Sequence, residues 1–222
     1  MEQSFFQNRV YNNFNKKIID LYNGELDILD VGCGSGLLAR EIKKINSNSS
    51  VYGIDISSAA KDEAIKFIDK FYLVDLDAQE DLEFNKKFDL IVFGDVLEHL
   101  KRPDVVLSAF KRFLKENGSV IISLPNVAYF RIRLRLLFGR FDYGDTGIMD
   151  RTHLKFFTYK TALGLIEKSG YLVDKRRYVF SRKLRFLNDD LVNKFACIFY
   201  NLFSIQFVFK IHAKHEDYFT TN

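Results

Sequence analysis

The chain has 222 residues, of which 47% are hydrophobic and 15% aromatic, and a formal net charge of +4 at pH 7. This composition argues against a disordered chain, and the length suits one domain with a substantial core. The small positive charge does not demand a nucleic-acid partner. Two cysteines are too few for a disulfide framework and favour a reducing, cytoplasmic setting. The N-terminus, residues 1–4, lacks the apolar core of a secretion signal.

Apolar segments along the chain alternate between strand and helix character. Strands are predicted at about 26–31, 51–55, 71–74, 88–93, 119–124, 171–180 and 205–213, and helices at about 8–22, 36–46, 58–69, 95–115, 158–169 and 188–203. This alternation predicts a mostly parallel α/β sheet with helices on both faces. The last two strands have a different apolar pattern, which predicts an antiparallel pair at one edge.

Three glycines follow the first predicted strand at alternate positions: Gly32, Gly34 and Gly36, with Cys33 among them. Strand, glycine-rich turn and helix form the layout of a nucleotide-cofactor site, because glycines permit sharp turns and close ligand approach. The discriminating residue is Asp30, two positions before the first glycine. A dinucleotide site uses the spacing G-x-G-x-x-G and presents a helix N-terminus to a pyrophosphate. A carboxylate here instead suits a ligand that carries positive charge.

The run D-V-G-C-G-S-G, residues 30–36, resembles motif I of the class I S-adenosylmethionine (SAM) dependent methyltransferases. SAM carries an ammonium and a sulfonium but no phosphate, in agreement with the acid in the motif. The resemblance extends from about residue 11 to the C-terminus, and it implies a Rossmann-like, seven-stranded, mostly parallel sheet with an antiparallel edge strand. We therefore expect a single methyltransferase domain over residues 1–222, with S-adenosylhomocysteine (SAH) as the cofactor product. A non-catalytic SAM-binding module and an NAD-dependent oxidoreductase are the alternatives.

Acids at the ends of the second and third predicted strands are candidates for further cofactor contacts. Asp55, followed by Ile56, lies about twenty residues past the glycines and can accept hydrogen bonds from both ribose hydroxyls. This feature does not separate SAM from NAD, since both carry a ribose. The resemblance implies that Asp77 approaches the adenine amino group and that the amide of Ala78 meets a ring nitrogen. Asp75 is the alternative to Asp77.

Two further cofactor contacts rest on the resemblance. Gly94 ends the fourth predicted strand, where a backbone carbonyl would meet the ammonium of SAM. Tyr11 lies on an N-terminal helix that, in such enzymes, closes over the methionine end of the cofactor.

The stretch D-V-L-E-H follows the fourth strand and contains Asp95, Glu98 and His99. Positions i, i+3 and i+4 share one face of a helix, so these side chains are predicted to converge. Two carboxylates and an imidazole suit Mg²⁺, Mn²⁺, Fe²⁺ or Zn²⁺. The alternative is a capping box, in which Asp95 caps a helix and Glu98 bonds back, with His99 merely packed.

Ubiquinone-biosynthesis O-methyltransferases carry a similar E-x-x-E-H at this point. Small-RNA 3′-terminal 2′-O-methyltransferases carry it with a further downstream histidine, and their four residues hold a metal. The resemblance implies that Asp95, Glu98, His99 and His153 hold Mg²⁺ or Mn²⁺, although the aspartate has a shorter side chain than the glutamate it replaces. Such a metal would lower the pKa of an acceptor hydroxyl. Without a metal, His99 or His153 would be the general base.

Residues 125–157 form a long insertion between the fifth and sixth strands. Arg131, Arg133 and Arg135 alternate there with isoleucine and leucine. Three interpretations stay open: a lid whose arginines pair with an acidic or phosphorylated acceptor, a surface for an anionic membrane, or solvated arginines beside packed apolar residues. Few aromatic residues interleave with the basic ones, which disfavours RNA binding.

The run that spans residues 139–158 is similar to one in bacterial methyltransferases of cell-surface glycan and secondary biosynthesis. This run indicates a lineage and not a substrate. For the chain as a whole we expect a small-molecule acceptor methylated at a hydroxyl oxygen, such as a sugar, a sugar nucleotide or a phenol. The alternative is a small-RNA ribose 2′-O-methyltransferase. A continuous basic face beside His99 and His153 would favour that alternative.

Overall fold

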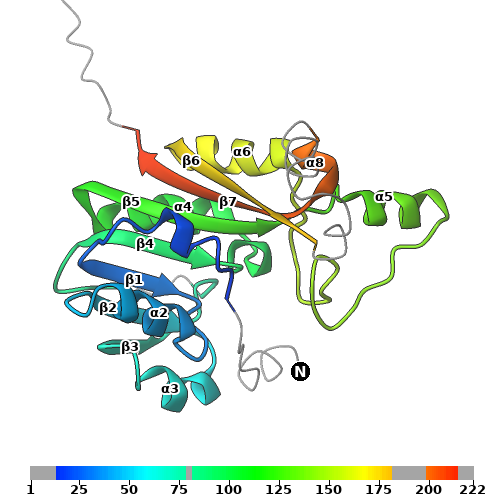
Figure 1. Ribbon diagram of the computed structural model, residues 1–222. Helices are drawn as coiled ribbons and strands as arrows, with labels where there is room; N and C mark the ends of the chain where they lie inside the picture. The colour runs from blue at the N-terminus through cyan, green and yellow to red at the C-terminus, as the bar shows by residue number, and fades with distance from the viewer. Residues whose placement is uncertain (1–13, 79–81, 182–198, 215–222) are drawn as a thin grey trace, which may run out of the picture.

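The computed structural model describes residues 14–78, 82–181 and 199–214, which contain one seven-stranded sheet (Figure 1). The strand order is β3-β2-β1-β4-β5-β7-β6, and β7 runs antiparallel to both of its neighbours. The strands are β1 (Asp27–Val31), β2 (Ser50–Asp55), β3 (Lys70–Leu73), β4 (Phe88–Gly94), β5 (Leu114–Pro125), β6 (Tyr171–Phe180) and β7 (Ser204–Ala213). All seven predicted strands and the antiparallel edge pair are confirmed. The edge strand is β6, and β7 lies inside it.

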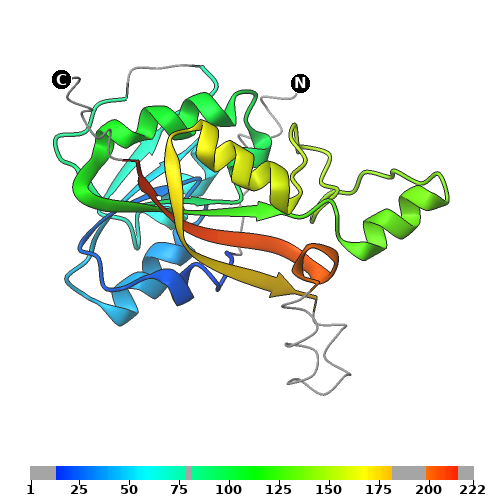
Figure 2. The ribbon, with the colours of Figure 1, turned by 90° about the horizontal axis from the view of Figure 1, so that it is seen from above.

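Helices cover both faces of the sheet, and each face has its own apolar core (Figure 2). One face carries η1 (Ile19–Leu21), α2 (Leu37–Ile45) and α3 (Ser58–Ala64). The other carries α4 (Pro103–Ala109), η3 (Phe110–Phe113) and α6 (Tyr159–Lys168). The central strands read as continuous apolar runs, with Ile28 and Leu29 fully buried, because both of their faces are covered.

The prediction of a single helix over residues 95–115 is wrong. The segment divides into η2 (Leu97–His99), α4 and η3, and β5 begins at Leu114 rather than at the predicted residue 119. Pro103 is the physical cause, since proline lacks an amide hydrogen and clashes with a preceding helical turn. It occupies the first turn of α4, where neither defect matters.

The terminal helices predicted at 8–22 and 188–203 lie partly outside the described residues. Within the described part, the first is the short turn η1 and the second is α8 (Tyr200–Phe203). The helix predicted at 158–169 is confirmed as α6. Thr158 and Thr161 form a reciprocal capping box at its start, which satisfies amide groups left open by the first turn.

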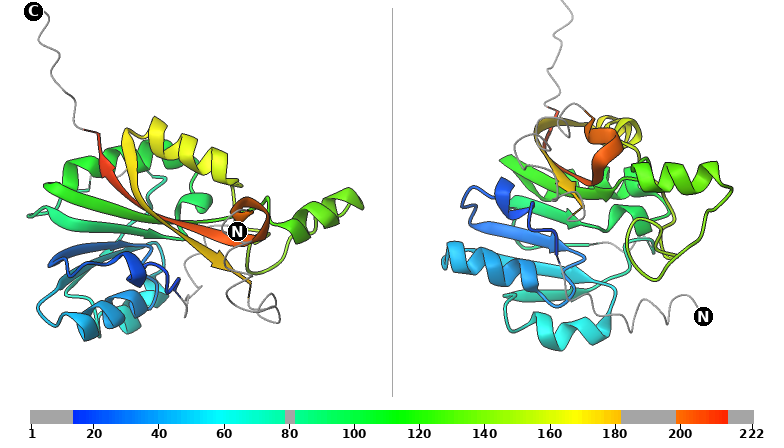
Figure 3. Two further views of the ribbon diagram at one scale, coloured as in Figure 1. Left: turned by 45° about the horizontal axis from the view of Figure 1, so that its top comes forward. Right: turned by 45° about the vertical axis from the view of Figure 1, so that its right-hand side comes forward.

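The insertion between β5 and α6 leaves the sheet and returns to the same place. An isolated bridge pairs Asn126 with Phe157, and between them α5 (Phe130–Leu137) projects away from the body of the molecule (Figures 1 and 3). Within the described ranges, no helix is long and apolar enough to cross a membrane.

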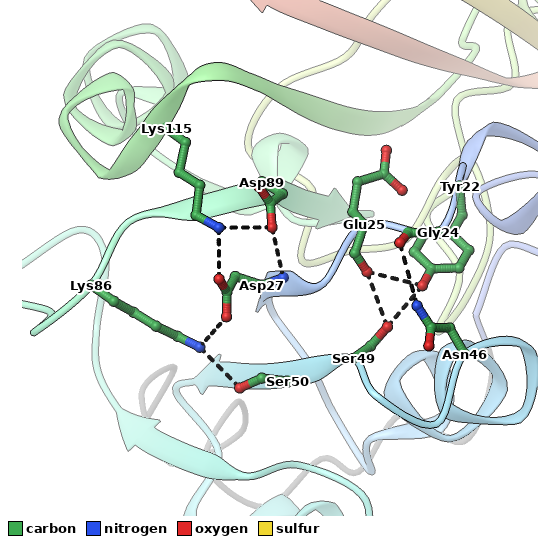
Figure 4. Close-up of polar contacts among 10 residues, drawn as sticks. All are labelled: Tyr22, Gly24, Glu25, Asp27, Asn46, Ser49, Ser50, Lys86, Asp89 and Lys115. Atoms are coloured by element: carbon green, nitrogen blue, oxygen red, sulfur yellow. Dashed lines mark hydrogen bonds and ion pairs between the residues drawn. The ribbon is translucent and has the colours of Figure 1, made fainter.

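A charged network ties the strands together at the amino ends of β1 and β4 (Figure 4). The Asp27 carboxylate accepts hydrogen bonds from Lys86 Nζ at 2.6 Å and Lys115 Nζ at 2.7 Å, and Lys115 Nζ also donates to Asp89 Oδ2 at 2.9 Å. Burial raises the pKa of Asp27, but the bonds to the two lysines outweigh it, so the pKa lies below its ordinary value. The charged residues at this end of the sheet therefore stabilise the fold. A ligand is expected at the opposite end, where the parallel strands have their carboxyl ends.

Candidate cofactor and acceptor site

The three glycines after β1 adopt backbone conformations that other residues rarely tolerate. Gly32, Gly34 and Gly36 have φ angles of 71°, 49° and 74°. A β-carbon on Gly32 would lie 2.3 Å from Cγ2 of Val96, and one on Gly36 would lie 3.1 Å from the backbone of α3. The turn therefore packs closely against neighbouring segments, and glycine is required for both its conformation and its contacts.

Asp30 is buried beside this turn with only 3% of its surface exposed. Its Oδ2 atom has no hydrogen-bond partner among the described residues. Burial, together with the nearby charge of Asp55, raises the pKa of Asp30 to about 8. An unpaired buried carboxylate is costly unless a cation meets it. The residues present therefore fit the ammonium group of SAM.

Asp55 is fixed at the tip of β2, next to the glycine turn. Its Oδ2 accepts a hydrogen bond from Gly34 N at 2.8 Å, and its Oδ1 accepts one from Ser57 N at 2.8 Å. Burial raises the pKa of Asp55, while these amides and that of Ile56 oppose the rise. Because the carboxylate is held in place, its remaining lone pairs are available for ribose hydroxyls. That role stays a prediction.

Cys33 is a packing residue of the turn. Its thiol is buried, and a β-carbon added to Gly53 of β2 would lie only 2.8 Å from its sulfur. Burial, and then the charges of Asp30 and Asp55, raise the pKa of this thiol. A buried thiol with a raised pKa is chemically inert, so its contribution to the site is its size.

The acids after β3 make local backbone contacts. The Asp77 carboxylate accepts hydrogen bonds from Lys101 N at 3.0 and 3.3 Å, which links this loop to the end of η2. Asp75 Oδ1 accepts from Asp77 N at 2.9 Å, and Asp75 O accepts from Ala78 N at 3.1 Å. The adenine contact of Asp77 and Ala78, or of Asp75 in its place, stays a prediction. Tyr11 lies outside the described residues.

Gly94 ends β4, and a β-carbon there would lie 3.3 Å from Ile18 Cδ1 of the N-terminal segment. The next residue, Asp95, has a left-handed backbone with φ 59°. Its Oδ1 accepts hydrogen bonds from Ser123 Oγ at 2.6 Å and from Gln206 Nε2. Its carboxylate thus bonds to β5 and β7.

The predicted capping box and the shared helical face of Asp95, Glu98 and His99 are both wrong. The segment Leu97–His99 is a single 3₁₀ turn preceded by Val96, and no side chain caps it. One 3₁₀ turn does not provide the i, i+3, i+4 face of an α-helix. Burial raises the pKa of Asp95, opposed by Ser123 and by a nearby histidine charge.

Glu98, His99 and His153 come together, with one candidate ligand atom from each lying within 4.8 Å of the others. His153 Nε2 lies 4.0 Å from Glu98 Oε1, and the two imidazole rings meet edge to face with centroids 4.8 Å apart. The Glu98 side chain is 1% exposed, and its Oε2 makes no hydrogen bond within the described part of the chain. Burial, and then the charges of Asp95 and Asp150, raise its pKa well above the ordinary value. Carboxylate and imidazole atoms grouped in this way suit a divalent cation.

Backbone and hydroxyl groups orient both histidines. His153 Nδ1 lies 3.0 Å from Ile148 O, and His99 Nδ1 lies 3.1 Å from Thr152 O. A carbonyl oxygen can only accept, so each Nδ1 donates, and in the neutral imidazole each Nε2 carries the lone pair. Thr152 Oγ1 donates to Asp150 Oδ1 at 2.7 Å and also lies 3.1 Å from His99 Nδ1. This is the outer support that metal-binding and general-base histidines share.

Sequence reasoning did not assign roles to Asp150 and Thr152, although both lie in the run that contains His153. Their spacing carries no signal, because Thr152 contacts His99 from a segment some fifty residues away in the sequence, and Asp150 bonds to Thr152. Glu98 O, which accepts hydrogen bonds from Leu154 N at 2.8 Å and Lys155 N at 2.9 Å, joins the two segments. The returning end of the insertion is therefore bonded directly to η2.

A hollow of about 480 Å³ opens beside this cluster. It is lined by Tyr143, Arg151, His153, Leu154 and Phe156. Two aromatic rings, a guanidinium and the imidazole suit a flat or ring-shaped acceptor with polar substituents. Arg151 is paired with Asp145 at 2.7 Å.

Comparison with known proteins agrees with this geometry. The family model described as a methyltransferase domain matches residues 8–175, about three quarters of the chain. The chain therefore belongs to this methyltransferase-domain family, and its seven-stranded sheet and glycine turn agree with the expected class I SAM-dependent methyltransferase fold.

Similar proteins include two ubiquinone-biosynthesis O-methyltransferases. The mitochondrial one of Candida albicans is 34% identical over 115 residues, which cover 48% of this chain and 34% of that protein. The one of Pelagibacter ubique is 29% identical over 126 residues, covering 55% of this chain and 51% of that protein. The matched segment thus spans between a third and about half of these curated relatives.

Solved structures show the same fold at low identity. A SAM-dependent methyltransferase from Archaeoglobus fulgidus has a TM-score of 0.57 at 21% identity and covers 90% of both chains. The N-methyltransferase NodS from Bradyrhizobium japonicum, solved with SAH, has a TM-score of 0.53 at 13% identity and covers 86% of this chain and 79% of that one.

Proposed function

We propose that this protein transfers the methyl group of SAM to a hydroxyl oxygen of a small molecule, with a phenol, a sugar or a sugar nucleotide as the acceptor class. The observation that carries the proposal is the pair of adjoining sites at the carboxyl ends of β1 and β4. One has an unpaired buried carboxylate beside a glycine turn, and the other has two oriented imidazoles beside a buried glutamate.

The cofactor side supplies charge complementarity and position. SAM, when bound, supplies an electrophilic methyl group on its sulfonium. Asp30 Oδ2 would accept hydrogen bonds from the ammonium, and Asp55 would accept them from the ribose. Asp30 is held by burial, and Asp55 is held by the backbone amides of Gly34 and Ser57. Fixing both ends of the ligand aligns the methyl group and removes the entropic cost of orientation from the reaction step.

On the acceptor side, we assign the proton-accepting role to His153. This residue lines the hollow, and in its neutral form the contact of Nδ1 with Ile148 O leaves the lone pair on Nε2. As the acceptor oxygen bonds to the methyl carbon, its proton passes to His153 Nε2 and the carbon–sulfur bond breaks. The products are a methyl ether and SAH.

In the alternative to this general-base role, Glu98, His99 and His153 would hold a Mg²⁺ or Mn²⁺ ion, and the Nε2 lone pair of His153 would then bind the ion and not take the proton. An ion there would lower the pKa of a coordinated hydroxyl and would pair with the otherwise uncompensated Glu98 carboxylate. The unpartnered Oε2 and raised pKa of Glu98 support this part of the proposal. Asp95 is not part of this ligand set, because its carboxylate bonds to Ser123 and Gln206.

Three alternatives receive less support. An RNA acceptor would be favoured by a continuous basic face, but the nearby Arg135 and Arg151 each pair with an aspartate. A non-catalytic module would have an occluded acceptor side, whereas a hollow opens next to His153. An NAD oxidoreductase would have no use for Asp30, whose charge opposes a pyrophosphate.

A calorimetric titration of Mn²⁺ into SAH-saturated protein tests the acceptor side. We expect saturable one-to-one binding that is lost in His153→Ala. His212→Ala, a change at an exposed histidine of β7, is the matched control and should bind as the wild type does. Parallel assays follow methyl transfer from labelled SAM to dihydroxyphenols with and without a chelator.

The Mn²⁺ titration and the methyl-transfer assay test the metal and the role of His153 separately. Transfer that survives chelation but is lost in His153→Ala would leave His153 as the general base and refute the metal. Transfer that is unchanged in His153→Ala would refute the assignment of the acceptor site.

A further inference from the structure

The projecting segment Phe130–Tyr143 gathers exposed apolar side chains, of which Phe141 and Tyr143 pack partly on Phe156. Leu137 is 78% exposed and Phe138 is 72% exposed. The exposed apolar residues of this segment are Leu134, Leu136, Leu137, Phe138, Phe141 and Tyr143. Single exposed apolar residues are ordinary, but a contiguous group on a projecting element marks an interaction surface.

Helix α5 arranges these residues with a defined polarity. Ile132 is the buried residue that packs with Tyr129 and Met149 against the body. At about 100° per residue, Leu134 and Leu137 point to the opposite side of the helix. Among the described residues, the outward apolar stripe is therefore open to a partner, while the inner face of the helix is packed against the body.

Arginines flank this stripe and give the segment an excess of positive charge. By the same helical geometry, Arg131 and Arg133 lie on either side of the leucines, and Arg140 follows in the loop; all three are exposed. The segment holds four arginines and one acid, Asp142, which pairs with Arg135 at 3.2 Å.

We infer that this segment docks on the surface of an anionic lipid bilayer, with Leu134, Leu137 and Phe138 in the headgroup boundary and the flanking arginines at the lipid phosphates. The combination of an apolar stripe and basic flanks is what interfacial helices present. A second copy of the chain fits less well, since a symmetric contact would bring two positively charged segments together. Tyr143 also lines the hollow beside His153, so a docked bilayer would lie near the acceptor entrance.

Co-sedimentation with vesicles of defined composition tests the inference without any activity assay. We expect the protein to bind vesicles of equal parts phosphatidylglycerol and phosphatidylcholine, and to bind pure phosphatidylcholine much more weakly. Leu137→Asp with Phe138→Asp should abolish binding, and Arg131→Gln with Arg140→Gln should weaken it about tenfold and reduce its salt dependence.

Ile45→Asp is the matched control, because Ile45 is 58% exposed at the far end of α2. It should bind vesicles like the wild type. Unchanged thermal unfolding and SAH affinity in each variant would establish that the fold and cofactor site are intact. Failure to bind anionic vesicles, or binding that the α5 variants leave intact, would overturn the inference. So would a dimer in light scattering that Leu137→Asp dissociates.

Discussion

Replacing Asp30 by asparagine should make the unliganded protein increasingly more stable than the wild type as the pH rises. The same replacement should weaken binding of the cofactor. The side chain is buried and its pKa is raised from 3.8 to about 8 by burial and by Asp55. A carboxyl whose folded-state pKa is raised is ionised first in the unfolded chain, so the wild type loses stability between about pH 4 and pH 8. Each pKa unit corresponds to 1.36 kcal/mol, so between pH 5 and pH 8 the loss is about 4 kcal/mol. Asparagine has the same shape and cannot ionise.

Urea unfolding at several pH values measures this effect. The free energy of unfolding of Asp30→Asn, relative to the wild type, should rise by about 4 kcal/mol from pH 5 to pH 8. At pH 8 the same variant should bind SAH about a hundredfold more weakly, because the ammonium loses its buried partner. Asp62→Asn, at an exposed site on α3, should show neither change. A stability difference that does not vary with pH, or SAH affinity unchanged in the variant, would refute the reasoning.

Two other substitutions test the scaffold around the site. Gly32→Ala forces a side chain into a left-handed conformation and against a neighbour 2.3 Å away, so urea unfolding should show a loss of about 3 kcal/mol. Gly164→Ala, in the open interior of α6, should instead gain up to about 1 kcal/mol. Lys210→Met should cost about 3–5 kcal/mol, since it leaves the carboxylate of Glu25 without its buried partner at 2.6 Å. The double variant Lys210→Met with Glu25→Gln should recover most of that loss. If Lys210→Met and the double variant lost the same free energy of unfolding, the two charges would not be energetically coupled.

The sequence was sufficient to predict the sheet and the glycine turn because those features are local. Buried parallel strands are continuous apolar runs, and the glycine turn with Asp30 is a contiguous motif. The failures came where distant segments decide the structure. Asp95, Glu98 and His99 were predicted to share one helical face, but their segment is a single 3₁₀ turn, and Asp95 Oδ1 accepts hydrogen bonds from Ser123 of β5 and Gln206 of β7.

The proximity of His99 and His153 could be expected from a family resemblance. The hydrogen bonds of Thr152 and Ile148 that orient the two imidazoles could not. Thr152, which is itself bonded to Asp150, reaches His99 because the insertion returns to η2 through backbone hydrogen bonds to Glu98. No periodicity or spacing encodes such a tertiary contact.

The most direct test of the central assignment is a calorimetric comparison of SAH and NADH binding to the wild-type protein at pH 8. The account predicts saturable one-to-one binding of SAH and no heat of binding for NADH, because Asp30 attracts an ammonium and repels a pyrophosphate. Binding of NADH without binding of SAH would contradict it.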